Sequence, residues 1–172
     1  MVKQSEIINL KLRKVEPSDL PFLYQWENDA SVWADGANHN PLSQQDLRDY
    51  IDSTTGDIYR DGQLRLIIES YSDCGHTTVG CIDLFDFDPR NRRAAIGMYI
   101  ASEHRGKGVG QAALEQLEAY AFGHLNLRVL YAVIATNNLP CSALYRSAGY
   151  TPSTPLSSWT LESDAVLWLK NQ

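Results

Sequence analysis

Residues 105–110 read Arg-Gly-Lys-Gly-Val-Gly, and a helix-like pattern of apolar residues follows them at once. The first amides of a helix have no intrahelical partners, and the helix dipole adds positive potential there. Glycines let a backbone approach a phosphate closely, and Arg105 and Lys107 add positive charge. The stretch therefore predicts a cradle for a pyrophosphate, whereas the plainer alternative is a strand-to-helix turn that needs glycine only for its backbone angles.

Two common phosphate-binding motifs are compared with this loop. The P-loop pattern Gly-x-x-x-x-Gly-Lys-Ser/Thr is absent from it. Residues 108–113, "GVGQAA", satisfy the dinucleotide pattern Gly-x-Gly-x-x-Gly/Ala. That fingerprint also needs an acid about 20 residues on and a place in the first strand-helix unit of a parallel sheet. The following run "RVLYAVIATNN" contains no acid, so the sequence disfavours dinucleotide binding.

The elements that must position this loop follow from hydrophobic periodicity and turn signals. Three antiparallel strands precede the loop, and a helix-strand-helix unit follows it. Ser18 and Ser43 are the expected N-caps of the first two helices. The predicted strands are residues 7–15, 63–69, 77–87, 93–100, 128–135, a segment near Trp159 and 165–169, and the predicted helices are 16–28, 43–51, 109–124 and 137–148.

The 172 residues predict one domain, residues 1–172, with a formal net charge of −6. An acidic chain is a poor general binder of nucleic acid, and no run of residues has the length and apolarity of a membrane helix or signal peptide. The three cysteines are expected to be free thiols, the four histidines lack metal-ligand spacing, and we expect a cytoplasmic protein without a metal.

Two motifs together resemble the GNAT superfamily of acetyl-CoA-dependent N-acetyltransferases, over nearly the whole chain. Arg105, Gly108 and Gly110 match the family signature Arg/Gln-x-x-Gly-x-Gly/Ala. Asn138 is followed seven residues on by Tyr145 and then by Gly-Tyr at 149–150. The runs "NRRAAIGMYIASEHRGKGVGQAALEQLEAYAF" and "WENDASVW" are similar to the branch that acetylates ribosomal-protein N-termini and spermidine.

The resemblance implies an α+β fold with a mixed, mostly antiparallel central sheet of about six or seven strands flanked by about four helices. It also implies acetyl-CoA as co-substrate. Backbone groups of one strand would hold the pantetheine arm, amides of the glycine loop would hold the pyrophosphate, and one side chain would contact the cofactor near the pantetheine. These cofactor-binding residues are Met98, Tyr99 and Ile100; Arg105, Gly106, Lys107, Gly108, Val109 and Gly110; and Asn138.

Acetyl transfer needs a neutral amine, a polarised carbonyl and a stabilised leaving thiolate. Tyr145 is the candidate acid for the thiolate, and its alternative role is that of a core aromatic residue. Asp83 is the first candidate base, ahead of Asp86 and Asp88, and its alternative role is that of a solvated acid on a strand face. Relatives commonly carry Glu where this chain has Ala95, which weakens both a base and a polyamine assignment.

The substrate is expected to enter over the first two helices and their loop. Glu27, Trp33 and Asp35 are the candidate substrate-binding residues, and Asp29 lies among them. Carboxylates would attract a cationic amine and an aromatic face would add cation–π attraction. The alternative is an ordinary solvated loop with one packing tryptophan.

Two functional hypotheses follow. The first is an N-acetyltransferase in which a primary amine attacks the thioester directly, the amine belonging to a protein N-terminus, a polyamine or a small molecule. The second is a non-catalytic acyl-CoA-binding module. The sequence leaves open the acceptor, other acyl groups and the oligomeric state, for which a homodimer is one option.

Overall fold

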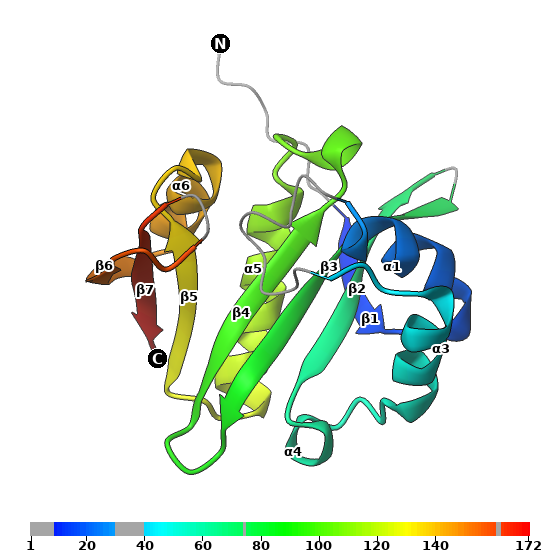
Figure 1. Cartoon of the computed structure of the whole chain (residues 1–172), viewed down its shortest axis with the longest axis horizontal. Coiled ribbons are helices and arrows are strands. Elements are labelled where there is room, and N and C mark those ends of the chain that lie inside the picture. Colours follow the sequence, from blue (N-terminus) through cyan, green and yellow to red (C-terminus); the bar gives the residue numbers. More distant parts are fainter. Residues whose placement is uncertain (1–8, 30–39, 74, 161–162) are drawn as a thin grey trace.

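The computed structural model describes residues 9–29, 40–73, 75–160 and 163–172 (Figure 1). Its centre is a seven-stranded sheet in the order β1-β2-β3-β4-β5-β7-β6. β4 and β5 run parallel, and every other neighbouring pair of described strands is antiparallel. This confirms the expected fold class. The strands are β1 Leu10–Lys14, β2 Leu64–Ser72, β3 Gly75–Asp88, β4 Arg93–Ile100, β5 Val129–Ala135, β6 Thr151–Leu156 and β7 Ala165–Asn171.

The described part of the chain has five α-helices where about four were expected. The additional helix, α4, is a single turn. The helices are α1 Leu20–Glu27, α3 Gln44–Ser53, α4 Ile58–Asp61, α5 Val109–Glu118 and α6 Leu139–Ser147. Short 3-10 turns precede α1 at Pro17–Asp19 and the glycine loop at Ser102–His104, and a π-helix, Ala119–His124, continues α5.

Two apolar cores lie on opposite faces of the sheet. The larger one includes Ala113, Leu114 and Leu117 of α5, which pack on strand residues such as Ile82 and Ile96. The smaller one joins α1 and α3 to the other face through Leu23, Trp26, Leu47, Ile51, Ile67 and Cys81. We call these the α5 face and the α1 face; α5 lies behind β4 in Figure 1. Since side chains alternate along a strand, neighbouring residues face different cores.

The two parallel strands separate soon after they meet. β4 and β5 pair at only three positions, the last of which joins Ala95 to Tyr131. β4 nevertheless continues to Ile100 and β5 to Ala135. The strands therefore form a fork, closed at Ala95 and Tyr131 and open towards the glycine loop and α6 (Figure 1).

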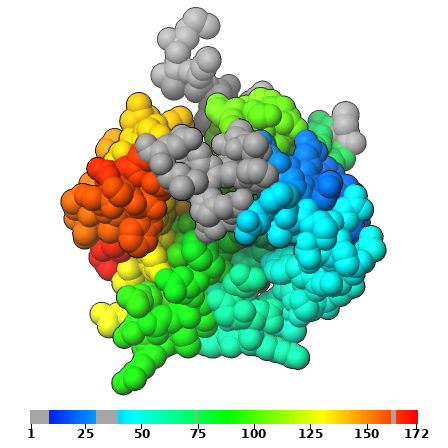
Figure 2. Space-filling model, viewed as in Figure 1, coloured from blue at the N-terminus to red at the C-terminus, as the bar shows by residue number. Residues whose placement is uncertain are grey.

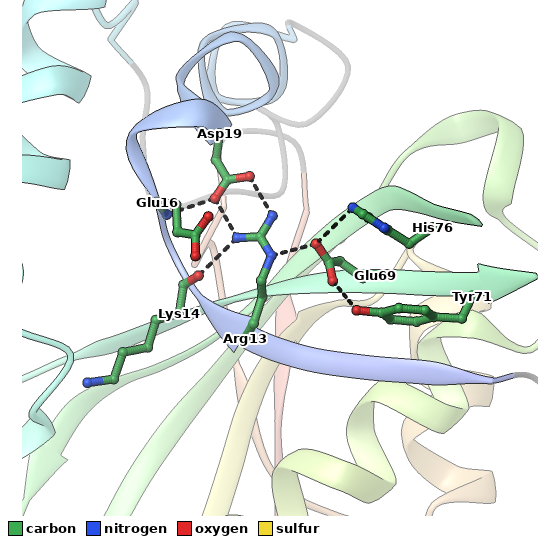
Figure 3. Close-up of polar contacts among 7 residues, drawn as sticks. All are labelled: Arg13, Lys14, Glu16, Asp19, Glu69, Tyr71 and His76. Atoms are coloured by element: carbon green, nitrogen blue, oxygen red, sulfur yellow. Dashed lines mark hydrogen bonds and ion pairs between the residues drawn. The ribbon is translucent and has the colours of Figure 1, made fainter.

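An arginine fixes the start of α1 to the sheet (Figure 3). Arg13 of β1 donates to both oxygens of Asp19 at 2.7 and 2.8 Å and to Glu69 of β2 at 2.5 Å. Glu69 also accepts from the Tyr71 hydroxyl at 2.7 Å. Asp19 and Glu69 are 2% and 5% exposed. Buried charges need such partners, so this cluster sets where α1 begins.

Local signals predicted some helix ends and missed others. Ser43 caps α3, since its hydroxyl accepts from the Asp46 amide at 3.1 Å, as expected. The cap assigned to Ser18 is wrong, because this residue lies inside the 3-10 turn and Asp19 is the N-cap of α1. There the Asp19 carboxylate accepts from the Glu16 amide at 2.8 Å.

Two strand expectations also need correction. The strand expected near Trp159 lies earlier, at β6, whose Pro152 and Pro155 are tolerated because β6 is at the sheet edge. The continuous apolar run of β5 predicts burial on both faces, yet Val133 is 40% exposed. The reason is the fork, which leaves this part of β5 without β4 beside it.

Candidate active site

The glycine loop has the left-handed backbone that its composition predicts. Gly106 and Gly108 have φ of +71° and +82°, which residues with a β-carbon rarely adopt. Gly108 is the N-cap of α5, and the Ala112 amide bonds back to its carbonyl at 3.1 Å. Val109 and Gly110 are the first two residues of α5, so their amides have no helical carbonyl four residues earlier to bond. The loop therefore presents helix N-terminal donors that can bind an anion.

Arg105 is exposed, and its side chain bonds to the protein's own backbone. Its Nε donates to the Ile100 carbonyl at 2.8 Å, and its guanidinium lies 5.7 Å from the centre of the Tyr99 ring. Its amide donates to the Ser102 carbonyl at 3.3 Å. Arg105 thus ties the loop to the end of β4. Both predicted cradle cations, Arg105 and Lys107, are exposed.

Residues 98–100 of β4 lie along the open part of the fork. Their other edge pairs with β3, where Tyr99 is opposite Cys81 and Ile100 opposite Gly80. A β-carbon at Gly80 would lie 2.2 Å from the Tyr99 carbonyl oxygen, so only glycine fits there. An antiparallel strand directs alternate backbone groups to each side. The groups of this segment that face the fork can therefore bond an extended ligand chain.

Helix α6 brings Asn138 and Tyr145 to the other side of the fork. Asn138 caps the helix, since its Oδ1 accepts from the Cys141 amide at 3.1 Å. Tyr145 is 2% exposed and its ring meets Tyr150 edge-on at 4.9 Å. Burial raises the pKa of the Tyr145 hydroxyl well above its usual value near 10. This tyrosine keeps its proton at neutral pH.

Gly110 marks the place where the loop, the fork and α6 meet. A β-carbon there would lie 3.2 Å from Leu144 of α6 and 3.5 Å from the sulfur of Met98. The N-terminus of α5 is thereby held against both β4 and the helix that carries Tyr145. The two sequence motifs therefore lie together in the fold, although Gly110 and Tyr145 are 35 residues apart in the chain.

The candidate acids Glu27 and Asp83 come together around a residue that sequence reasoning missed. Arg65 of β2 donates to both oxygens of Asp83 at 2.9 and 2.8 Å and to Glu27 at 2.5 Å. Arg65 stands directly opposite Asp83 in the β2–β3 ladder. That register follows from strand pairing, so no motif in the sequence signalled it. A cavity of about 270 Å³ lies beside this cluster, with Arg65, Glu27 and Tyr50 in its wall.

The end of α1 carries further aromatic and acidic groups towards β4. Trp26 lies 5.4 Å from the Tyr99 ring, and the Tyr99 hydroxyl donates to Asp29 at 3.4 Å. In Figure 2 the green surface of β3 and β4 lies between α1 and α3 on one side and the C-terminal strands on the other. Two predicted substrate residues, Trp33 and Asp35, lie outside the described residues.

The remaining expectations concern metals, thiols and membranes. Among the described residues, no three His, Cys, Asp or Glu side chains gather in a way that would hold a metal ion. Cys81 is a buried free thiol as expected, while Cys74 is outside the described ranges. No described helix is long and apolar enough to cross a membrane. The cytoplasmic location stays a prediction.

Comparisons with known proteins agree with this geometry. The family described as "Acetyltransferase (GNAT) domain" matches residues 9–151. The spermidine N(1)-acetyltransferase of Escherichia coli K12 is 28% identical over 146 residues, which cover 83% of this chain and 73% of that protein.

Solved structures match over more of the chain. The Vibrio cholerae spermidine N-acetyltransferase in complex with CoA and spermine superimposes with a TM-score of 0.84 at 23% identity, covering 95% of both chains. A dodecameric structure of the same enzyme gives 0.79 at 23% identity, covering 95% and 94%. At this identity the superpositions show the shared fold.

Proposed function

Because the chain belongs to the GNAT acetyltransferase family and is an acetyl-CoA-dependent N-acetyltransferase, we propose that its acceptor is a primary amine of a polyamine. The observation that carries the proposal is the acidic surface beside the fork, where Glu27 and Asp83 surround Arg65 and Asp29 contacts Tyr99. Carboxylates that water can reach are the groups that attract a polycation. The spermidine acetyltransferase of E. coli, similar over most of this chain, supports the same substrate class.

The fork and the glycine loop fit acetyl-CoA. Acetyl-CoA supplies the thioester and its thiolate leaving group. We assign the pantetheine contacts to the fork-facing backbone of residues 98–100 and the pyrophosphate contacts to the amides from Gly106 to Gly110. Arg105 supports the loop through Ile100. Asn138 caps α6 and so positions the helix that carries Tyr145.

Tyr145 is our candidate proton donor. Its raised pKa means that the hydroxyl is protonated throughout the neutral range and can donate a hydrogen bond to the departing sulfur. Both oxygens of Asp83 already accept from Arg65, so removing a proton from the amine would compete with a charge-assisted pair. We therefore favour attraction and orientation of the ammonium group as the role of Asp83 and Glu27. The role of Asp83 as general base stays a prediction.

A thiol-release assay with purified protein and acetyl-CoA tests the function. The panel contains spermidine, spermine, an N-terminal peptide and an aminoglycoside, and we expect the polyamines to give the highest kcat/KM. Tyr145→Phe should lower kcat about 10²- to 10⁴-fold, the usual range for a lost general acid. Tyr150→Phe is the matched control, because Tyr150 is equally buried and packs on the same ring, and it should change kcat less than about threefold.

The panel also separates the alternatives. Binding of acetyl-CoA without thiol release under any amine would favour a non-catalytic module. Faster turnover with the peptide than with the polyamines would overturn the polyamine assignment. Equal losses in the two tyrosine variants would remove Tyr145 from catalysis.

We also propose that the chain self-associates, as the V. cholerae enzyme does in its dodecameric structure. Light scattering of the purified protein measures the mass of the assembly, and a monomer at assay concentration would contradict the proposal.

A further inference from the structure

Strand β3 contains a bulge where it passes the closed end of the fork. Phe85 pairs with Ala95 and Asp88 pairs with Arg93, so two residues of β3 lie opposite one residue of β4. The first of the two, Asp86, has φ of +47°, which is uncommon for a residue with a β-carbon. A bulge of this kind re-aims side chains relative to the regular alternation.

The packing of β3 shows that the alternation changes at the bulge. Before it, Ile82 and Leu84 belong to the core on the α5 face, and Asp83 points to the α1 face with Arg65. Regular alternation would put Phe87 on the same face as Asp83, the α1 face. Beyond the bulge, however, Phe87 packs against the α5 core. Asp86 is thereby placed on the α1 face, on the same side as the acceptor carboxylates.

Tyr131 of β5 holds Asp86 at the closed end of the fork. Its neighbours Leu130 and Ala132 belong to the α5 core, so Tyr131 lies on the α1 face, and its hydroxyl donates to the Asp86 carboxylate. Desolvation and this hydrogen bond raise the pKa of Tyr131 to about 12, so the donor keeps its proton. Asp86 itself is exposed to solvent. The carboxylate is oriented and still accessible.

The surface between Asp86 and the open end of the fork is small and apolar. Gly97 of β4 lies along it, and a β-carbon there would be 3.4 Å from the Phe85 ring and 3.8 Å from the Asp83 carboxylate. Ala95, two residues earlier, is 3% exposed. Phe85 and Val133 are 38% and 40% exposed on either side of β4. Methylene groups of an extended amine can cover the exposed side chains of Phe85 and Val133, because burying apolar surface is favourable.

We propose that Asp86 binds the distal ammonium group of the acceptor and so selects diamines of a certain length. The inference rests on the proposed polyamine substrate. Ala95 lies three residues before Met98, which is about 10 Å along a strand. A saturated chain of about eight atoms spans about the same distance, judged from extended-chain bond lengths.

The local charge agrees with this role. Arg93, which pairs with Asp88 across the β3–β4 ladder, lies 3.4 Å from the Asp88 carboxylate, and this carboxylate also accepts from Asn91 at 2.6 Å. Arg93 therefore neutralises Asp88, and the carboxylate of Asp86 carries the remaining negative charge. An ammonium group bound there replaces no existing ion pair of Asp86 among the described contacts.

The test compares diamines with monoamines of equal length. The purified full chain is assayed with 1,8-diaminooctane, 1,4-diaminobutane and octylamine. Asp86→Asn should raise KM for diaminooctane about tenfold and leave kcat and the octylamine constants within about twofold, a difference of about 1.4 kcal/mol. Asn suits a positive φ, so the backbone is kept. Tyr131→Phe should give a smaller increase, of about threefold.

Asp88→Asn is the matched control, since it removes one carboxylate two residues away and changes the net charge equally. Equal KM changes in the Asp86 and Asp88 variants would overturn the proposal in favour of general attraction. An equal loss with octylamine would also overturn it. If the wild-type protein acetylates peptides and no amine of this series, the proposed substrate class itself is wrong. If the wild-type protein acetylates polyamines and Asp86→Asn leaves the KM for diaminooctane unchanged, only the role of Asp86 is refuted and the substrate class stands.

Discussion

Two arginines on the α1 face each join a pair of carboxylates, one at either end of α1. Arg13 binds Asp19 before the helix and Glu69 of β2, as Figure 3 shows. Arg65 binds Glu27 at the helix end and Asp83 of β3. The contact distances are alike, from 2.5 to 2.8 Å in these four ion pairs.

The two clusters differ in the exposure of their carboxylates. The side chains of Asp19 and Glu69 are 2% and 6% exposed, whereas those of Glu27 and Asp83 are 19% and 20% exposed. Water reaches the second pair, and a cavity opens beside it. The same ionic chemistry therefore fixes α1 at one end, and at the other end it offers charge that a substrate can reach. Exposure, rather than residue type, separates the structural cluster from the one that we propose to bind substrate.

The largest expected effect is on stability. Arg13→Met removes the guanidinium that pairs with two nearly dry carboxylates and should lower the free energy of unfolding by about 3–5 kcal/mol, as for other broken buried pairs. Arg65→Met leaves carboxylates that water can solvate, and should cost about 1–2 kcal/mol. Urea unfolding followed by circular dichroism measures both. An equal loss of unfolding free energy in the Arg65 and Arg13 variants would contradict the distinction between a buried and an accessible cluster.

A smaller effect is expected on substrate binding. Glu27→Gln removes an accessible charge beside the fork and should raise KM for spermidine about tenfold, or about 1.4 kcal/mol, with little change in kcat. Asp19→Asn is the matched control at the other end of α1. It should lower stability and leave KM within about twofold. Should both variants raise KM alike, the helix position as a whole, and not the local charge, would govern binding.

The smallest effect is on the acid dependence of stability. Burial disfavours the charged form of Glu69, but hydrogen bonds from Tyr71 and Arg13 outweigh it and lower its pKa below the usual 4.5. A carboxyl group whose pKa is lower in the folded protein stabilises the fold above pH 4.5. This stabilisation is lost as the pH falls through the pKa of the folded state. Glu69→Gln should therefore be less stable at pH 7 and show a shallower loss between pH 5 and 3. Thermal unfolding across this range is the measurement, and parallel curves for the two proteins would contradict it.

Some of the site is readable from residues close together in the chain. Gly106 and Gly108 adopt the positive φ angles that their loop predicts, Ser43 caps α3, and β4 has the expected bounds. These features depend on backbone angles, hydrogen bonds within one turn and alternation along one strand. Each is a property of a few consecutive residues.

Other parts required partners that are distant in the chain. Arg65 meets Asp83 only through the register of β2 and β3, and Tyr131 meets Asp86 only because a bulge and a parallel pairing bring them together. β6 was misplaced because its prolines argue against a strand until its edge position is known. Register, bulges and edges are set by the whole sheet, so a single sequence leaves them open.

The sequence by itself determined the family, through the glycine loop and the Asn138–Tyr145 spacing, and with it the acetyl donor. The tertiary structure decided which acids stand together, how far water reaches them, and where the fork closes. The physical reason is the range of the interactions. Helix caps and turns are local, whereas the solvation of a charge and the pairing of strands depend on segments that only folding brings into contact.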